Sequence, residues 1–260
     1  MQMPSGATGM GKDIAMASSS VTFGMSSRKD WRSAITALRR LLSNPNDTTQ
    51  VFRIMRALNA GTPKAGYERL LRSAEGGRIA YQRVELAARL SDPAFVGSFT
   101  AGSVGAAYAA FLRETGYSAD GLVAASQADD ASRAAEHPYA WFARRTRDAH
   151  DIWHILTGYR ANDPLGEACL VAFSYAQTGG PGWALLAVGS GLKALRSPHR
   201  KLAIKALWEG YRNGRRAAWL AGQDYERVLA EPLDGARQRL GIREPVAYRA
   251  LQKILRESAD

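Results

Sequence analysis

The sequence predicts an all-α protein: a single-domain, multi-helix bundle over residues 28–260, preceded by a disordered N-terminal leader over residues 1–27. Three observations lead to this prediction. From Asp30 onward, apolar residues recur three and four positions apart, which is the period of an amphipathic helix and not of a strand. Residues that start and stop helices recur at short intervals. The leader is rich in Met, Gly, Ser and Ala, and it has neither a sustained apolar core nor the architecture of a signal peptide.

The first two helices are bounded by turn-forming residues. A helix that starts at Asp30 is broken by the segment Asn44–Asp47, which also supplies a cap for the next helix. That second helix ends at Gly61-Thr62-Pro63, where Gly and Pro make continuation unfavourable.

Glycines mark the next elements. Gly76-Gly77 separates two predicted helices, which cover residues 67–74 and 81–90. Small residues then mix with apolar ones over residues 94–105, and a tightly packed helix follows over residues 105–112. No Lys-Ser or Lys-Thr follows this glycine cluster, so we exclude a phosphate-binding P-loop.

The centre of the chain holds a candidate metal motif. A polar, alanine-rich helix is predicted over residues 122–135, and a helix over residues 144–156 then contains the run His150-Asp151-Ile152-Trp153-His154. Residues three and four apart share a helix face, so His150, Asp151 and His154 can converge on one point. Two of the four histidines of the chain lie in this pentapeptide, with a carboxylate between them. This pattern favours a metal site.

A fourth ligand is expected from the following helix. Gly158 fits the C-terminal cap of the motif helix, and Asn162-Asp163-Pro164 fits the start of the next one. Glu167 therefore falls in the first turn of that helix, where a short connection can fold it back onto the histidines. The alternative is that one histidine caps or packs while the other is solvated.

The remaining chain predicts three further helices. An apolar helix runs to Gln177, a second one starts at Trp183, and a long basic helix covers residues 200–220. The apolar faces could form an ordinary core or line a lipid pocket. The single cysteine, Cys169, lies in an apolar run, so it is expected to be a core residue and not a nucleophile.

The net charge of +11 indicates an anionic partner. The sequence has no recognised nucleic-acid-binding motif, so we expect no nucleic acid and favour an anionic membrane surface. The alternative is a solvated face without a partner. No apolar stretch reaches the roughly 20 residues that span a bilayer, and a single cysteine cannot form an internal disulfide. We expect a cytoplasmic protein of bacterial type, peripheral to the inner membrane.

The motif and its surroundings resemble the coenzyme Q (ubiquinone) biosynthesis protein four family. The resemblance covers residues 45–243 and includes the pentapeptide, Leu165-Gly166-Glu167, Gly102-Ser103-Val104-Gly105 and Leu207-Trp208-Glu209-Gly210-Tyr211. One residue more than is usual in the family lies between His154 and Glu167, within the turn over residues 159–164.

The resemblance implies an all-helical protein of ubiquinone synthesis with a divalent metal, zinc by family likeness, held by His150, Asp151, His154 and Glu167. By position, these four residues are also the implied catalytic residues. The implied reaction is the metal-dependent, oxidative decarboxylation of a polyprenylated 4-hydroxybenzoate-derived acid. An oxidative reaction would require a redox-active ion or another route to oxygen, because zinc does not change oxidation state. Implied partners are a prenyl lipid and other quinone-biosynthesis proteins, and a homo-oligomer is an open alternative.

The sequence is also compatible with two rival functions. The chain could be a non-catalytic lipid-binding scaffold that organises the ubiquinone-synthesis complex, with the metal only bracing two helices. An HD-type phosphohydrolase would need an additional upstream histidine and a downstream aspartate ligand. His137 is a poor match for that histidine, because Pro138 follows it and it lies close in sequence to the motif.

Overall fold

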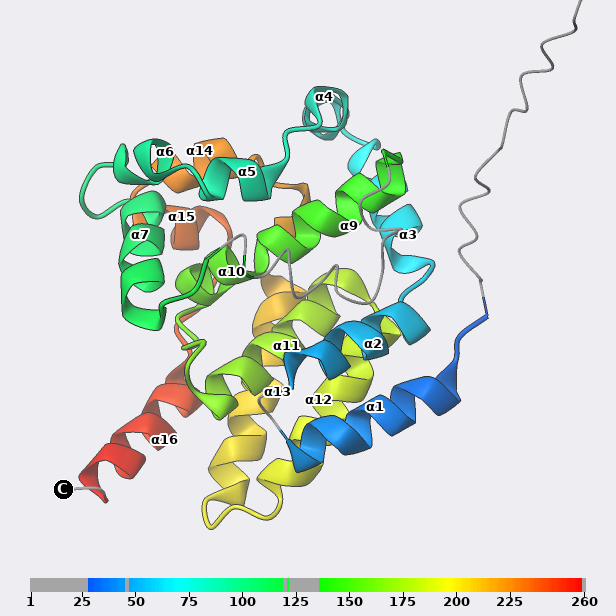
Figure 1. Ribbon diagram of the computed structural model, residues 1–260. Coiled ribbons are helices and arrows are strands. Elements are labelled where there is room, and N and C mark those ends of the chain that lie inside the picture. Colours follow the sequence, from blue (N-terminus) through cyan, green and yellow to red (C-terminus); the bar gives the residue numbers. More distant parts are fainter. Residues whose placement is uncertain (1–27, 45–46, 119–120, 122–135, 259–260) are drawn as a thin grey trace, which may run out of the picture.

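The structure, a computed structural model, describes residues 28–44, 47–118, 121 and 136–258. Every regular element in this part of the chain is a helix, and the one β-type feature among these residues is an isolated antiparallel bridge between Ser103 and Pro232 (Figure 1). The prediction of an all-α fold is therefore confirmed. The predicted leader over residues 1–27 and the predicted polar helix over residues 122–135 lie outside the described residues.

Among the described residues up to position 118, seven helices form the first part of the fold. They are α1 (Trp31–Ser43), α2 (Thr48–Leu58), α3 (Thr62–Leu70), α4 (Ala74–Gln82), α5 (Leu86–Leu90), α6 (Pro93–Gly97) and α7 (Val104–Thr115). Asp30 caps α1 as expected, since its carboxylate accepts a hydrogen bond from the Ser33 amide at 3.0 Å. Ser103 caps α7 in the same way by accepting from the Ala106 amide.

The predicted turn at Gly76-Gly77 is wrong, because both glycines lie inside α4. Gly76 is required for a different reason: a Cβ there would lie 1.9 Å from the Leu70 carbonyl oxygen. The residue thus lets the end of α3 pass against the first turn of α4. The chain turns instead at Arg83, which adopts φ 45° in the left-handed region.

The second part of the fold contains the helices of the metal motif and those that pack around them. They are α9 (Pro138–Asp148), α10 (His150–Thr157), α11 (Pro164–Thr178), α12 (Pro181–Ala194), α13 (Arg200–Arg216), the 3₁₀ turn η2 (Leu220–Gly222), α14 (Tyr225–Ala230), α15 (Leu233–Arg239) and α16 (Val246–Glu257). The predicted basic helix thus ends at Arg216, earlier than expected.

The motif helix is interrupted where a continuous helix was predicted over residues 144–156. At Ala149, which has ψ −12°, the backbone amide is shared between the carbonyls of Arg145 and Arg147. Helix α9 therefore ends at Asp148, and α10 begins at His150. Alanine is the strongest helix former, so no local signal in the sequence predicts this interruption.

Helices α11 and α13 pack along each other through the centre of the molecule (Figure 1). A Cβ at Gly210 of α13 would lie 2.5 Å from the Cys169 carbonyl oxygen, so glycine allows the two backbones to approach. The large core cluster surrounds this pair and includes Trp153 and Phe173. Cys169 is fully buried, as expected of a core residue.

A second, smaller core cluster joins three helices beside the main core. It contains Ala34 and Ala37 of α1, Ile54 and Leu58 of α2, and Leu186 of α12. None of the helices in the described ranges combines the length and apolar character that crossing a bilayer requires.

Candidate metal centre

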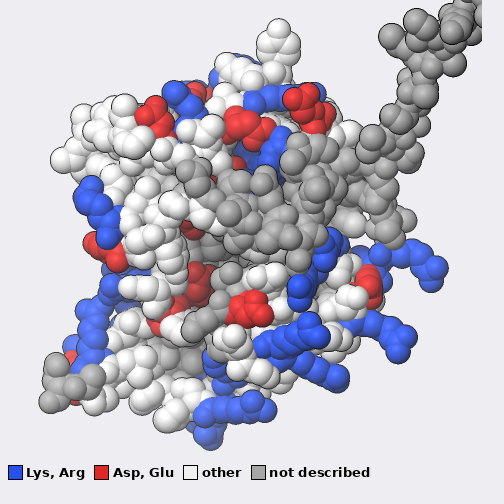
Figure 2. All heavy atoms as spheres, viewed as in Figure 1, with Lys and Arg blue, Asp and Glu red and all other residues white. Residues whose placement is uncertain are grey.

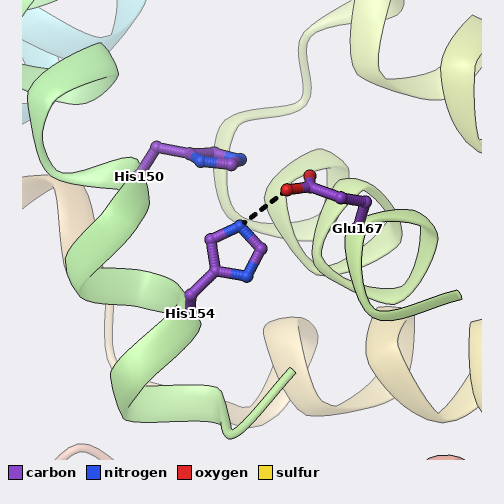
Figure 3. Close-up of side chains that lie close together, drawn as sticks. All are labelled: His150, His154 and Glu167. Carbon is purple, nitrogen blue, oxygen red and sulfur yellow. Dashed lines mark ion pairs between the residues drawn. The ribbon is translucent and has the colours of Figure 1, made fainter. Parts of the chain in front are cut away.

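Three of the four predicted ligands come together between two helices. His150 and His154 lie one turn apart on α10, and Glu167 lies in the first turn of α11. One nitrogen or carboxylate oxygen from each residue lies within 4.8 Å of those of the other two. Figure 3 shows the two imidazoles and the carboxylate pointing toward one another across the gap between α10 and α11.

The connection between α10 and α11 brings Glu167 to the histidines. Gly158 ends α10 at φ 75°, and Asp163 caps α11 by accepting from the amides of Leu165 and Gly166. A Cβ at Gly166 would lie 2.2 Å from the Arg160 carbonyl oxygen, so glycine lets the loop pass close to α11. The sequence therefore predicted both caps and the place of Glu167 in the first turn.

His154 is held in one orientation by its own helix end. Its Nδ1 lies 2.8 Å from the carbonyl oxygen of Tyr159, so an Nδ1–H can donate to that oxygen. In neutral imidazole this tautomer leaves a lone pair on Nε2, which faces the Glu167 carboxylate at 3.2 Å. Nε2 is buried and completes no hydrogen bond with the described residues. A backbone carbonyl that orients a histidine in this way is a common support for a metal ligand.

His150 is held by aromatic packing from a third helix. Its ring stacks on that of Trp183 of α12, with centroids 5.9 Å apart and planes at 6°. The two histidine rings lie edge to face at 4.9 Å, and Phe111 of α7 stacks on the His154 ring at 6.1 Å. Neither aromatic partner was predicted, because each comes from a helix that is distant in sequence and follows no spacing rule.

Asp151 lies beside His150, outside the group of three ligand atoms. Successive residues on a helix point about 100° apart, so the face that joins positions 150 and 154 does not include position 151. The expectation that all three motif side chains converge is corrected to this extent. Asp151 is buried, and its carboxylate oxygen lies 3.7 Å from His150 Nδ1.

The charges of the cluster shift two titrations in opposite directions. Burial would lower the pKa of His150, but the carboxylates of Asp151 and Glu167 outweigh it and raise that pKa. Burial would raise the pKa of Glu167, but His154 and His150 outweigh it and lower that pKa. The group therefore favours an ionised Glu167 carboxylate, and it favours a positive charge, such as that of a cation, at the point where the three side chains meet.

The donor set fits a divalent transition metal. Two imidazole nitrogens and one carboxylate oxygen are the ligands of several catalytic zinc sites and of non-haem iron oxygenases. The Nε2 of His154 supports this fit, because it is buried, makes no hydrogen bond with the described residues and lies 3.2 Å from the Glu167 carboxylate. Three protein ligands leave coordination positions open for another molecule.

Two of the three side chains, those of His150 and Glu167, border a large cleft. The cleft has a volume of about 2530 Å³, and its walls include His150, Glu167 and Trp183. Apolar residues of α11 and α12, such as Val171 and Leu186, also line it. Part of the apolar segment between Leu165 and Leu195 thus faces the cleft. Other residues of this segment, such as Leu170, are buried in the hydrophobic core.

The chain matches a known protein family over most of its length. Residues 30–246 match the family described as coenzyme Q (ubiquinone) biosynthesis protein Coq4. A relative from Pyrenophora tritici-repentis, "Ubiquinone biosynthesis protein coq4, mitochondrial", is 32% identical over 74% of this chain and 63% of that protein. The homologue from Bos taurus, also named as mitochondrial, is 31% identical over 71% of this chain and 67% of that protein. The chain thus spans just under two thirds of the fungal relative.

A solved structure shares the fold. A crystal structure of a protein from Nostoc punctiforme superposes with a TM-score of 0.58 at 20% identity, and it covers 82% of this chain and 99% of that one. At this identity the likeness shows the fold alone.

Proposed function

Because the chain belongs to the coenzyme Q (ubiquinone) biosynthesis protein Coq4 family, we propose that it is a metal-dependent enzyme of ubiquinone synthesis. Its substrate is a polyprenylated aromatic acid derived from 4-hydroxybenzoate, from which it removes the ring carboxylate. The observation that carries the proposal is the group of His150, His154 and Glu167, whose ligand atoms converge on one point at the edge of a large cleft.

His150, His154 and Glu167 would hold the metal in this proposal. When bound, a divalent ion supplies positive charge for the substrate carboxylate or phenol oxygen and for the electron pair that remains when carbon dioxide leaves. Asp151 keeps the His150 ring oriented through its carboxylate, and Tyr159 does the same for His154 through its carbonyl oxygen.

The reaction breaks the bond between the ring carbon and the carboxylate carbon. Carbon dioxide leaves, and the electron pair of that bond stays on the ring carbon. A proton replaces the carboxylate in simple decarboxylation. In the oxidative version a hydroxyl group from water replaces it, and the two electrons and two protons that are released reduce oxygen to hydrogen peroxide. This version requires a redox-active ion or another route to oxygen, because zinc does not change oxidation state.

Residues on the cleft walls have separate tasks. The Arg147 guanidinium lies one turn before His150 and lines the cleft, where an ion pair with Asp148 at 2.6 Å holds it in place. The apolar residues of α11 and α12 exclude water and hold the prenyl tail. Other quinone-biosynthesis proteins are the expected protein partners, and an inner membrane, reached from the cytoplasmic side, is the expected location.

The test combines metal analysis with a product assay. Purified full-length chain is reconstituted with zinc, manganese or iron(II), and carbon dioxide release from a prenylated 4-hydroxybenzoate-type acid is measured with and without oxygen. We expect metal-dependent release, which His150→Ala and His154→Ala abolish together with metal binding while helicity is retained. His199→Ala is the matched control, because His199 precedes α13 outside the cluster.

The outcomes separate the proposed enzyme from its rival. Release that requires oxygen indicates oxidative decarboxylation, and release without oxygen indicates the simple reaction. Stoichiometric metal with no release under either atmosphere would refute the enzyme and support the non-catalytic lipid-binding scaffold. Full metal occupancy in both histidine variants would remove the basis of the proposal.

A further inference from the structure

Exposed apolar side chains gather on three helices that lie next to one another. Large hydrophobic residues that solvent reaches are concentrated on α1, on α12 and its end, and on α13, and they are Trp31, Ile35, Leu42, Val188, Leu192, Leu195, Ile204 and Trp208. Val188 and Trp208 are 60% and 59% exposed. A concentration of this kind on one part of a surface indicates an interaction site.

The exposed residues form stripes on the outer sides of these helices. Val188, Leu192 and Leu195 follow one another at spacings of four and three, which places them on one face of α12. Leu186, on the opposite face of α12, packs inward, and Gly189 on the adjoining face lets the helix approach Leu38 of α1. The stripes are therefore separate from the faces that build the core.

Positive charge surrounds the same stripes. Segments 31–43 and 181–216 contain eleven lysines and arginines and a single acid, so they account for nearly all of the net charge of +11. In Figure 2, Lys and Arg dominate the lower right and the bottom of the view, over α1 and the turn between α12 and α13, whereas the top mixes both signs.

These basic side chains are exposed and take part in no ion pair within the described ranges of the chain. They are Arg32, Arg39, Arg40, Lys193, Arg196, Arg200, Lys201, Lys205, Arg212, Arg215 and Arg216. The one acid, Glu209, accepts a hydrogen bond from the Ala247 amide at 2.8 Å and so serves the packing of α16. The positive charge of this face is therefore available to an external anion.

The cleft of the metal centre reaches this face. Its walls include His150 and Glu167 at the centre, and they also include Leu42 of α1, Leu192 of α12 and Arg196 after α12. Leu42 and Leu192 are among the exposed apolar residues. One continuous cleft thus connects the candidate metal ligands with the basic apolar surface.

We propose that the face made by α1, α12 and α13 docks on an anionic lipid bilayer and that the cleft opens toward that bilayer. Apolar stripes enter the boundary between headgroups and acyl chains, while the basic side chains reach the anionic headgroups. Charge complementarity selects this occupant over a second copy of the chain, because two such faces would bring like charges together. If the cleft opens toward the bilayer, a prenyl tail could enter it from there. This use of the cleft rests on the proposed function, whereas the docking of the face does not.

The docking is tested with the full chain and vesicles of phosphatidylcholine, with or without phosphatidylglycerol. We expect binding only to the anionic vesicles, and weaker binding at high salt. Each basic residue near such a surface contributes about a fivefold gain in affinity, so Arg200→Glu with Lys201→Glu should lower binding at least about thirtyfold. Val188→Glu with Trp208→Glu should lower it at least about tenfold, since both side chains are more than half exposed and would lose their apolar contact with the bilayer.

Matched controls carry the same changes elsewhere. Arg72→Glu with Arg113→Glu reverses two exposed charges, one in the turn after α3 and one on α7, and Tyr81→Glu with Val246→Glu changes two exposed apolar residues. Controls should bind like the unmodified chain, and all variants should keep their metal content and helicity. Equal binding to neutral and anionic vesicles, unchanged binding of the face variants, or equal losses in the controls would overturn the proposal. The proposal would also be overturned if this face were a contact between two copies of the chain. In that case the unmodified chain would not bind vesicles, and the variants of this face would have half its molecular mass in solution.

The two proposals can fail separately. Carbon dioxide release from a water-soluble, short-chain acid should be unchanged in the face variants, whereas release from a long-chain acid in anionic vesicles should fall with binding. If neither acid gives carbon dioxide while docking follows the face variants, the proposed function fails and the docking stands.

Discussion

Replacing Arg237 by Met should loosen the helix that carries both histidine ligands. Arg237 extends from α15 to the end of α10, where its Nε donates to the Leu156 carbonyl at 3.0 Å and its Nη2 donates to the Ile155 carbonyl at 2.9 Å. These carbonyls belong to the last turn of α10, where no amide from a later helical turn can donate a hydrogen bond to them. The cation also lies at the negative end of the helix dipole.

The expected cost follows from these contacts. A hydrogen bond to a charged group contributes about 1.5–3 kcal/mol, and partial exposure of Arg237 reduces the sum of the two. We therefore expect Arg237→Met to lower the free energy of unfolding of the metal-free chain by about 2–4 kcal/mol. Displacement of supporting groups around a metal ligand typically weakens metal binding about 10–100-fold, and we expect a loss in this range.

The assay is urea unfolding of the metal-free chain, followed by competition with a chelator to measure metal affinity. Arg239→Met is the matched control on the same helix, because Arg239 pairs with Glu231 at the surface and should change stability by less than about 1 kcal/mol. Arg237→Lys should restore part of the loss, since Lys keeps the charge but cannot donate to both carbonyls in the same geometry. Equal stability and metal affinity of the Arg237→Met and Arg239→Met variants would refute the reasoning.

Three further predictions concern the site and the core. Asp151→Asn should keep the metal but weaken its binding about 10–100-fold, because Asp151 supports His150 without joining the ligand group; loss of all metal, as in His154→Ala, would instead make Asp151 a ligand. The raised pKa of His150 stabilises the metal-free fold below pH 6.5, and this contribution should disappear as the pH rises through the raised value; urea unfolding across this range should show the loss in the unmodified chain and not in His150→Ala. Gly210→Leu should destabilise the fold by at least about 1–3 kcal/mol in thermal or urea unfolding, because even its Cβ would lie 2.5 Å from the Cys169 carbonyl oxygen. Gly77→Leu is the control and should cost less, because the space around its Cβ is open.

The local structure could be predicted from the sequence because it depends on neighbours in the chain. Apolar residues at helical spacing predicted an all-α fold, and the side chains of Asp30 and Asp163 cap the helices at which they were placed. Glu167 was predicted in the first turn of its helix, because Asp163 and Pro164 fix where that helix begins. The two histidines one turn apart needed only the geometry of a helix.

Other features depend on residues that are far apart in the chain, and only the tertiary structure decided them. Gly76 lies inside a helix because the end of α3 passes against it, and the break at Ala149 has no local signal. Asp151 stays outside the ligand group because Glu167 approaches the face of α10 that holds positions 150 and 154. The rings of Trp183 and Phe111 come to the histidines from other helices, and the stripes of α1, α12 and α13 become one surface only when these helices pack. Periodicity and caps act over a few residues, whereas the assembly of a site and a surface requires contacts between elements whose relative positions the whole core determines.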